Sequence, residues 1–451
     1  MKKLISLLTL IPWSLTLTGG LSGCGCSDNS TGKKDSGVDA DAAQTDDGQV
    51  DSQIDGAHDA DRDSGRDGHV DAAPVDAFVY HDCMAPREVQ EITPGELYRI
   101  PVNEQEYHGG FDWNGQYLVQ SDRRCEWPNY GQDLYMIDLQ TMEESLVVAR
   151  LGGQAGLSLD GSSFVYSDFS FAIENDPENN YRTELILHDL ITHDETRLTY
   201  SNEGKVWPKF NGTHIVYEGL EYISPSDDYA TLRLLDIATS EEIVLATEEQ
   251  GITSSNIWDI NSEYVAWRAV PDGEPRSAWD VFLYHIPTGQ TSRLNTRSDY
   301  IFDVLLSPER VVWTERRNDY WGIYSRDLVT QVEETIVEGD ADRMLRGVNQ
   351  NLVTWWDFSR SGCEFPCSSY DIFISDLENG ITRRLTSTSN QWGIGPSTCK
   401  WLFYSEIDSS VSFRLYAKDM VAAGILDQNC HLIACDPDTE PCPMLEWIGP
   451  P

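Results

Sequence analysis

The chain has few basic residues and few histidines for its length. Its 451 residues contain 32 Lys and Arg against 75 Asp and Glu, so the formal net charge is −43, and only 9 residues are His. A surface this acidic is repelled by phosphate groups. We therefore expect no nucleic-acid partner and no attachment to anionic lipid by charge alone.

The sequence also lacks the short motifs that mark common catalytic centres. There is no His-Glu-x-x-His and no Cys-x-x-Cys, and the histidines are scattered. The run from Gly156 to Gly161 resembles a nucleophile elbow, but Asp160 stands at the final glycine of that motif and the run leads into a hairpin. We assign no catalytic residue, no metal site and no cofactor, and a binding protein is a better expectation than an enzyme.

Apolar stretches with the period of a helix are missing, and strand-sized apolar runs recur in their place. One phrase occurs seven times between Tyr117 and Met420: an apolar strand, a polar loop, a second apolar strand and a tight turn. Copies of the second strand begin at Asp133, Glu184, Thr231, Asp280, Gly322, Asp371 and Arg414. A turn position precedes each first strand, at intervals of 42 to 51 residues, at Asn114, Asp160, Asn211, Asn261, Ser307, Asn349 and Thr398.

With a further strand on each side, every repeat holds four antiparallel strands in roughly 45 residues, which is the size of one propeller blade. The sequence therefore predicts an all-β fold, a seven-bladed β-propeller of four-stranded antiparallel blades. The seventh copy lacks a good fourth strand, and the stretch that begins at Gly95 could supply it. That pairing would close the ring and remove an exposed sheet edge.

An aspartate closes the second strand in six of the seven copies, and a threonine follows three residues later in five. The six are Asp138, Asp189, Asp236, Asp327, Asp376 and Asp419. A ring of metal ligands is one interpretation of this pattern. We favour a structural turn, because Asp and Thr side chains bind nearby backbone N–H groups.

The N-terminus has the pattern of an export signal: Lys2 and Lys3 precede a short apolar stretch from Leu4 to Leu17. The sequence Leu-Ser-Gly-Cys that ends at Cys24 resembles the lipobox of bacterial lipoproteins. This resemblance implies cleavage before Cys24 and a lipid on that cysteine, which would attach the protein to a membrane. Gly25 after the cysteine implies an outer-membrane lipoprotein, periplasmic or surface-exposed; ordinary secretion with cleavage elsewhere is the alternative.

Between Cys24 and Asp82 there are fifteen Asp, no Glu and four Lys or Arg, a net charge of −11. Such a segment cannot bury enough apolar surface to offset its ordering entropy, so we expect a disordered tether. The predicted organisation is a lipoprotein signal peptide at 1–23, an Asp-rich linker at 24–87, the propeller at 88–428 and a Cys-rich tail at 429–451.

Ten cysteines occur in this chain, and export would place them in an oxidising compartment. The disulfide candidates are Cys83, Cys125, Cys363, Cys367, Cys399, Cys430, Cys435 and Cys442, of which Cys363 and Cys367 are expected to pair locally. The connectivity of the others stays open. A zinc site is the rival interpretation, and the small number of nearby histidines disfavours it.

The mouth of the central channel, where each innermost strand begins, is the usual ligand site of a propeller. Six residues upstream of the turn positions, polar and aromatic side chains predominate: His108, Gln154, Lys205, Ser255, Arg343 and Trp392. Nearby aromatic residues are Trp207, Trp258, Tyr300 and Phe302. This mixture would suit a peptide strand or a sugar, although several of the aromatic residues could instead pack between blades.

The repeats resemble the TolB-type propeller repeat over about residues 95–420. The resemblance rests on motifs such as His285-Ile-Pro-Thr-Gly289 and Arg384-Leu-Thr386. It implies a fold and no particular activity; TolB itself has six blades and a preceding α/β domain. We expect a monomeric, lipid-anchored propeller of the cell envelope that binds or scaffolds a protein or peptide. The alternative is a propeller enzyme, a lyase or glycoside hydrolase, acting on envelope or environmental polysaccharide.

Overall fold

A computed structural model describes most of the chain after the predicted linker. The described residues are 85–102, 110–124, 132–150, 152–171, 182–201, 203–224, 227–250, 252, 257–275, 278–294, 300–317, 319–359, 370–386, 391–394, 398–407 and 413–435. The predictions for the signal peptide, Cys24 and the tether fall outside these ranges, as do those for Cys83, Cys125, Cys363, Cys367, Cys442, His108 and Ser255.

Seven antiparallel sheets follow one another along the chain and confirm the predicted seven-bladed propeller. Blade 1 comprises β3 (Phe111–Trp113), β4 (Tyr117–Asp122), β5 (Asp133–Asp138) and β6 (Glu143–Val148). Blade 2 comprises β7 (Gln154–Asp160), β8 (Ser163–Asp168), β9 (Glu184–Asp189) and β10 (Glu195–Arg197). Blade 3 comprises β11 (Gly204–Phe210), β12 (His214–Ser224), β13 (Asp227–Asp236) and β14 (Glu242–Thr247).

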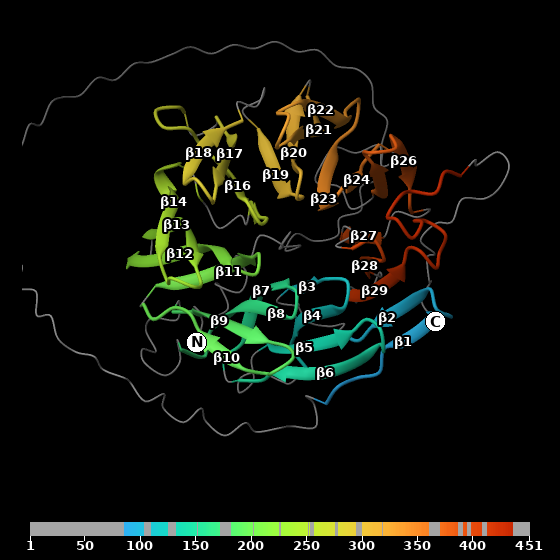
Figure 1. Cartoon of the computed structure of the whole chain (residues 1–451), viewed down its shortest axis with the longest axis horizontal. Helices are drawn as coiled ribbons and strands as arrows, with labels where there is room; N and C mark the ends of the chain where they lie inside the picture. The colour runs from blue at the N-terminus through green and yellow to red at the C-terminus, as the bar shows by residue number, and fades with distance from the viewer. Residues whose placement is uncertain are drawn as a thin grey trace, which may run out of the picture. The chain divides into compact units, whose positions relative to one another are not determined.

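The remaining blades have the same order. Blade 4 comprises β15 (Trp258–Ile260), β16 (Tyr264–Ala269), β17 (Asp280–His285) and β18 (Gln290–Arg293). Blade 5 comprises β19 (Ile301–Leu306), β20 (Arg310–Arg317), β21 (Tyr320–Asp327) and β22 (Glu333–Val337). Blade 6 comprises β23 (Arg343–Asn349), β24 (Leu352–Asp357), β25 (Asp371–Asp376) and β26 (Ile381–Arg384). Figure 1 shows the blades around a ring, with the first strand of each blade toward the centre.

Blade 7 is completed from the other end of the described chain. It contains β27 (Gln391–Ile394), β28 (Trp401–Ile407) and β29 (Phe413–Asp419), and β2 (Leu97–Ile100) pairs antiparallel with β29. This pairing confirms the predicted closing strand. A short strand that the sequence did not predict, β1 (Gln90–Thr93), lies outside β2, so that blade 7 has five strands.

Apolar clusters between neighbouring blades form the core. Trp267, Trp313, Trp355 and Trp401, which occupy the second strand of their blades, are all nearly inaccessible to solvent. The face of blade 3 that carries Val216 packs against Trp258 and Trp267 of blade 4. Each sheet therefore buries its faces against its two neighbours, which is why a single blade would not be stable alone.

The aspartates that recur in six of the repeats lie in the tight turns between the third and fourth strands. In blade 1, Asp138 Oδ1 accepts hydrogen bonds from the backbone N–H groups of Gln140 and Thr141 at 2.8 and 3.1 Å. The same turn, in which one carboxylate oxygen accepts two backbone N–H groups, recurs at Asp189, Asp236, Asp327, Asp376 and Asp419. In blade 4, His285 replaces the aspartate and its Nδ1 lies 2.8 Å from Thr288 Oγ1. The six aspartate side chains thus satisfy backbone donors that the turn leaves without a ladder partner.

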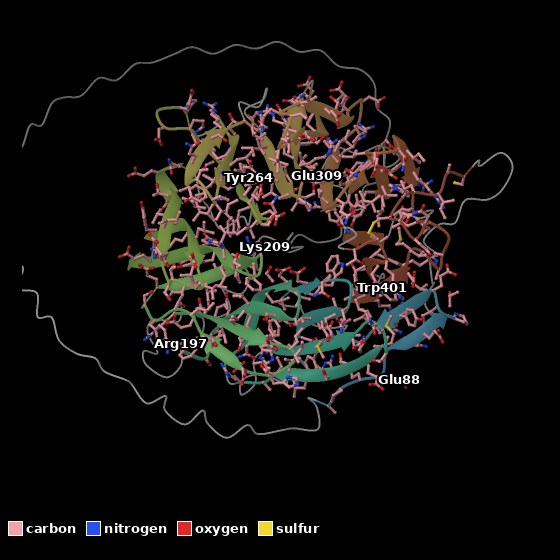
Figure 2. All side chains as sticks on the ribbon, viewed as in Figure 1. Glu88, Arg197, Lys209, Tyr264, Glu309 and Trp401 are labelled. Carbon is pink, nitrogen blue, oxygen red and sulfur yellow. A yellow bond between two sulfur atoms is a disulfide. The ribbon has the colours of Figure 1, made fainter. Side chains whose placement is uncertain are left out.

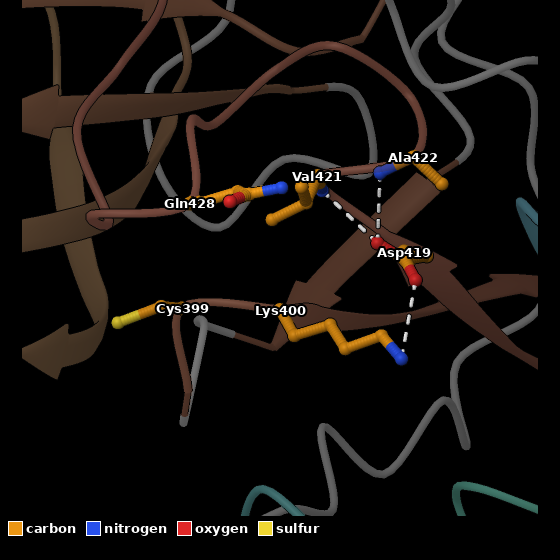
Figure 3. A pocket seen from close by; sticks show the side chains of 6 residues that line it. All are labelled: Cys399, Lys400, Asp419, Val421, Ala422 and Gln428. Atoms are coloured by element: carbon orange, nitrogen blue, oxygen red, sulfur yellow. Dashed lines mark hydrogen bonds and ion pairs between the residues drawn. The ribbon is translucent and has the colours of Figure 1, made fainter.

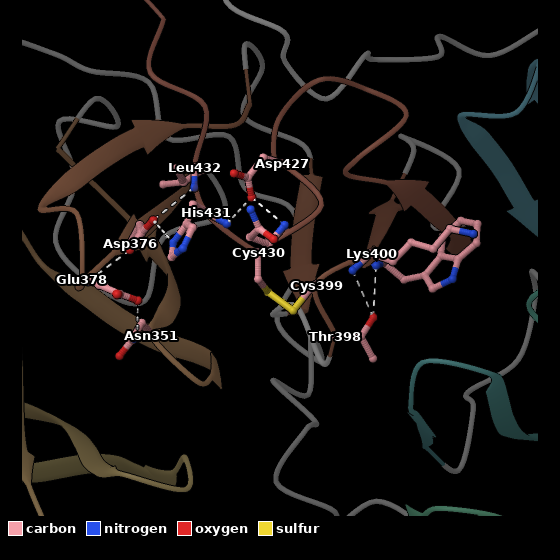
Figure 4. The surroundings of a disulfide bond; sticks show 12 residues. Asn351, Asp376, Glu378, Thr398, Cys399, Lys400, Asp427, Cys430, His431 and Leu432 are labelled. Carbon is pink, nitrogen blue, oxygen red and sulfur yellow. Dashed lines mark hydrogen bonds and ion pairs between the residues drawn. A yellow bond between two sulfur atoms is a disulfide. The ribbon is translucent and has the colours of Figure 1, made fainter.

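The chain after β29 folds back over the turns of blades 6 and 7. Cys399 and Cys430 form a disulfide, and Cys435 is disulfide-bonded as well. His431 and Leu432 reach the turn of blade 6, where the backbone N–H of Leu432 donates to Asp376 Oδ2 at 3.1 Å (Figure 4). We call residues 420–435 the C-terminal strap. In the described part of the chain no helix has the length and apolar character needed to cross a membrane.

Candidate functional site

The predicted ligand residues with described side chains are mostly buried at the channel mouth. Lys205 is 2% exposed; its Nζ lies 3.3 Å from Glu184 Oε2 and donates to the carbonyl of Glu203 at 2.7 Å. Arg343 Nε donates to Asp357 Oδ2 at 2.9 Å. These two cations therefore neutralise acids of blades 2 and 6 and are already engaged.

The aromatic residues divide into buried and exposed members. Trp258 is buried, and its Nε1 donates to the carbonyl of Trp207 at 3.3 Å between blades 3 and 4. Tyr300 is 51% exposed. Trp392 lies in β27, where only the backbone is described. The structure thus places Tyr300 at the surface and gives the tryptophans of blades 3 and 4 a packing role.

Gln154, the first residue of β7, has a different environment. Its side chain is fully buried, and among the described residues neither its amide oxygen nor its amide nitrogen has a hydrogen-bond partner. Its backbone carbonyl accepts the hydroxyl of Ser121 from blade 1. The Gln154 backbone therefore connects blades 1 and 2. Its buried side-chain amide requires water or another polar group as a hydrogen-bond partner.

Buried ion pairs surround the channel mouth where the second strand of a blade ends and the third begins. Arg124 bridges Asp122 at 2.7 Å and Glu144 at 2.6 Å, and its guanidinium stacks 3.6 Å from the ring centroid of Tyr135. Opposite Asp122 across the ladder stands Asp133, whose pKa burial raises to about 7. Paired charges of this kind hold strand ends in place, because removing either partner would leave an uncompensated buried charge.

A second set of charges lines the channel itself. Asp112 in β3, Lys209 in β11 and Asp259 in β15 belong to the innermost strands of three blades, and the Lys209 charge acts on both acids. Burial raises the pKa of Asp112 and of Asp259, and the lysine opposes that shift. Lys209 stands in the middle of the ring in Figure 2. The channel therefore carries both signs of charge.

Side chains on the innermost strands also join neighbouring blades by hydrogen bonds, which we call clasps. Asp112 Oδ2 accepts the backbone N–H of Leu159 in blade 2 at 2.9 Å, and Asp259 Oδ2 accepts that of Leu306 in blade 5 at 2.8 Å. Between blades 2 and 3, Ser158 Oγ accepts the N–H of Phe210 at 3.1 Å. Each of these acceptors stands two residues before the turn position of its repeat. This spacing can be seen in the sequence, but the predicted ligand residues were taken six residues before the turn, so these acceptors were missed.

A third carboxylate of the channel region, Asp303 in β19, lies between two arginines. It is 3.8 Å from Arg346 of blade 6 and interacts with Arg268 of blade 4. Burial raises the pKa of Asp303, whereas both arginines lower it. β-Bulges interrupt the innermost strands at Ile301/Val304 and Leu345/Gly347. A bulge re-aims the side chains that follow it, so simple counting from the turn misses these residues.

A cluster with exposed aromatic side chains lies at one end of blade 5. Tyr300 precedes β19, and its carbonyl accepts the backbone N–H of Arg316 at 3.0 Å. Arg316 pairs across the ladder with Trp321, beside the 37% exposed Tyr320. We define the blade 5 patch as Tyr300, Phe302, Arg316, Tyr320 and Trp321. Tyr300 and Phe302 are among the predicted ligand residues, whereas Arg316, Tyr320 and Trp321 were not predicted, because they belong to the second and third strands.

Contacts beneath its surface fix the blade 5 patch. Phe302 and Trp321 meet edge to face with ring centroids 5.7 Å apart, and both pack against the core of blade 6. The N–H of Trp321 donates to Asp342 Oδ1 at 3.1 Å. Arg316 is exposed, and its Nε donates to the carbonyl of Asp319. Phe302 and Trp321 thus anchor this end of blade 5 to blade 6, with Arg316 on the same face as Trp321 and the exposed Tyr320 on the other face of the hairpin.

A shallow pocket of about 410 Å³ opens at the opposite, turn end of blade 7. Its lining consists of Cys399, Lys400, Asp419, Val421, Ala422 and Gln428 (Figure 3). Asp419 accepts the N–H groups of Val421 and Ala422 and lies 3.5 Å from the Lys400 ammonium. The polar groups of this pocket therefore serve the turn itself. In the described ranges, no three His, Cys, Asp or Glu side chains are placed to share a metal ion.

Comparison with solved structures shows the propeller fold. The β-propeller domain of the Trilobed protease from Pyrococcus furiosus is similar over 71% of this chain and 95% of its own, at 12% identity and a TM-score of 0.52. Oligogalacturonate lyase from Vibrio parahaemolyticus is similar over 74% of this chain and 98% of its own, at 13% identity and a TM-score of 0.50. Acylaminoacyl peptidase of Pyrococcus horikoshii is similar over 71% of this chain and 53% of its own, at 13% identity and a TM-score of 0.52.

TolB from Acinetobacter baumannii also matches, at 13% identity and a TM-score of 0.34. A TM-score this low does not support a structural relationship, so the resemblance to TolB rests on the repeat motifs. No family model and no curated protein matches the sequence. The three structural matches above therefore show a shared fold, and at 12–13% identity they do not assign an activity to this chain.

Proposed function

We propose that this chain is a lipid-anchored binding or scaffold protein of the cell envelope that holds a protein or peptide partner at the channel mouth. The blade 5 patch is the observation that carries the proposal. Tyrosine, tryptophan and arginine are the residues most enriched at the energetic centres of protein interfaces. Here Tyr300, Arg316 and Tyr320 are exposed at the same end of blade 5, in a chain that is otherwise rich in acids.

Rigidity supports the same proposal. The Asp112 and Asp259 clasps join adjacent blades, and the Lys205 and Arg343 ion pairs fix strand ends at the mouth. A rigid frame loses little conformational entropy when a partner binds, so exposed aromatic side chains contribute more of their contact energy. This frame suits recognition of a partner better than a large closing motion.

The test is capture of a partner by the full-length protein in crosslinked cell envelopes. We expect a discrete partner with wild type and at least about a tenfold loss of it with the double variant Tyr300→Ala/Tyr320→Ala, because truncating interface hot spots costs about 2 kcal/mol or more each. Tyr200→Ala is the matched control, since Tyr200 is 72% exposed on blade 2 and lies outside the patch. Equal capture by wild type and the double variant would overturn the assignment of the patch.

The membrane attachment rests on the sequence around Cys24. The proposal expects a lipid on Cys24 that keeps the protein in the membrane fraction, with the Asp-rich linker separating the propeller from the bilayer. Cells fed a labelled fatty acid should label wild type and leave Cys24→Ser unlabelled and soluble. Cys26→Ser, two residues away, is the control and should be labelled as wild type is.

The alternative, an enzyme acting on polysaccharide, draws support from the channel carboxylates. Burial raises the pKa of Asp112, Asp259 and Asp303, and acids with shifted pKa values are common in sites of acid–base catalysis. Incubation of the purified protein with acidic and neutral polysaccharides decides the matter. Release of reducing or unsaturated sugar by wild type, and its loss in Asp303→Asn, would favour the enzyme.

A further inference from the structure

The second strand of most blades carries an acid eight residues after the turn position of its repeat. Five blades have this acid, as Asp122, Asp168, Glu315, Asp357 and Glu406, and blade 4 has Ala269 there. In blade 3 glycine occupies that position, Gly219, and the acid is Glu218, one residue earlier. Because side chains alternate between the two faces of a strand, this shift moves the acid to the opposite face.

The shift turns Glu218 toward blade 4. Val216 and Leu220, two residues to either side, belong to the apolar cluster that blade 3 shares with Trp258 and Trp267 of blade 4. The ladder between β12 and β13 is regular through this stretch, with Glu218 opposite Leu232. Glu218 therefore occupies the seam between blades 3 and 4, close to the end where the channel opens.

Nothing in the described seam compensates this carboxyl. Glu218 is fully buried, and within the described ranges neither of its oxygens has a hydrogen-bond partner. The acids of blades 1, 2, 5 and 6 differ in this respect, because each is paired with an arginine, namely Arg124, Arg150, Arg317 and Arg343. On the face of β13 beside Glu218 stand Ala230, Leu232 and Leu234, all apolar.

The titratable groups on the neighbouring strands are engaged elsewhere. On β11, Lys205 pairs with Glu184, and the charge of Lys209 acts on Asp112 and Asp259. On β13, Arg233 pairs with Glu203 and Glu242, and Asp236 accepts the N–H groups of its own turn. On β15, Asp259 accepts the N–H of Leu306. Burial alone accordingly raises the pKa of Glu218 to about 8.

We propose that Glu218 is a proton-dependent latch between blades 3 and 4. As a neutral carboxylic acid it is tolerated in the apolar seam, and as a carboxylate it draws water in and opens the seam at the channel mouth. The latch goes beyond the proposed binding function and does not depend on it. The motivating observation is an acid at an apolar interface at the one repeat position where other blades carry Ser, Thr, Arg or Trp.

The direction of the pH effect on opening follows from the different pKa values of Glu218 in the closed and open seam. An open, hydrated seam returns Glu218 toward its ordinary pKa of 4.5, whereas the closed seam holds the proton up to a pKa of about 8. Between these values the closed state binds more protons than the open state. The equilibrium constant for opening should rise by up to about tenfold for each pH unit in this window and level off above it.

Hydrogen exchange of peptides from β12 and β15 measures this opening in the intact protein, after correction for the intrinsic effect of pH on exchange. Glu218→Gln keeps the shape and removes the charge. We expect wild type and Glu218→Gln to be similarly protected near pH 5. Near pH 9, protection in wild type should be at least about tenfold lower than in Glu218→Gln. Glu309→Gln, an exposed position in blade 5, should follow wild type. A wild-type to Glu218→Gln ratio that stays constant across this range overturns the latch.

Infrared spectroscopy observes the proton itself. A protonated carboxyl has a carbonyl stretch that a carboxylate lacks, so wild type at neutral pH should show a band that is absent from Glu218→Gln and that disappears above the pKa. Identical carbonyl regions in the two proteins at neutral pH would also overturn the proposal, because Glu218 would then already be ionised inside the closed seam.

Discussion

The ammonium of Lys418 forms an ion pair with the carboxylate of Glu96, across a sequence separation of 322 residues. Lys418 lies in β29 and is 1% exposed, whereas Glu96 immediately precedes β2 and its side chain is 28% exposed. The pair therefore stands where the two ends of the propeller meet. Four residue pairs join β2 to β29, so this contact reinforces a short ladder.

The first prediction concerns this closure. Glu96→Gln removes the partner of a buried ammonium, and we expect it to lower the free energy of unfolding by about 1–3 kcal/mol, because an unpaired buried charge costs more than the pair itself contributes. Lys418→Met replaces the charge by an apolar side chain of similar length and should cost less. Urea unfolding of both variants tests the order; a neutral Glu96→Gln beside a strongly destabilising Lys418→Met would contradict it.

The second prediction concerns the clasp between blades 1 and 2. Asp112→Ala leaves the buried N–H of Leu159 without its acceptor and should destabilise the protein by about 1–3 kcal/mol. Asp112→Asn retains an acceptor oxygen and should be nearly neutral.

The pH dependence separates these two effects. Because burial raises the pKa of Asp112, wild type loses stability as pH rises from the ordinary pKa of 3.8 through the raised value in the folded state. Asp112→Asn lacks this loss, so its stability relative to wild type should increase over the same interval. Thermal unfolding at several pH values provides the measurement, and a constant difference between the two proteins would argue against a buried, ionising Asp112.

The repeat made the blades predictable, and its local signals were the most reliable. The side chain of Asp138 meets its own turn within three residues, so sequence spacing alone defines that contact. The contacts of Asp303 and Arg346 depend on bulges in two blades, and no spacing in the sequence marks a bulge. β1 was missed because it is a short, partly polar strand at the sheet edge. Local turns and periodic strands can thus be predicted, whereas side chains that converge on the axis require the assembled ring.

The third prediction concerns the C-terminal strap. The Cys399–Cys430 disulfide joins residues 31 positions apart and attaches the strap to the turn before β28. Cys399→Ser/Cys430→Ser should lower the free energy of unfolding by about 3–4 kcal/mol, the amount expected for a loop of this length. Differential scanning calorimetry without reductant tests this value. An unchanged unfolding temperature would show that the apolar contacts of Ile425 and Leu426 hold the strap without the disulfide.

The fourth prediction follows the strap to Asp376. Its carboxylate accepts hydrogen bonds from the N–H groups of Glu378 and Asn379 and, on the other oxygen, from Asn379 Nδ2 at 2.8 Å and Leu432 N at 3.1 Å. Burial alone would raise the pKa of Asp376, but these donors outweigh it and hold the pKa below its ordinary value of 3.8. The stabilisation is therefore fully present above the ordinary pKa and is lost as pH falls through the lower folded value.

Asp376→Asn should consequently be less stable than wild type at neutral pH by about 1–3 kcal/mol, since hydrogen bonds to a charged acceptor are the stronger kind. The difference should shrink in acid, because wild-type Asp376 is then protonated and resembles the amide. Asp340→Asn, at an exposed position in the loop between blades 5 and 6, is the control and should match wild type at both pH values. Urea unfolding near pH 7 and near pH 3 makes the comparison. A difference that persists undiminished in acid would mean that the shape of the asparagine, and not the lost charge, disrupts the contact between blade 6 and the strap.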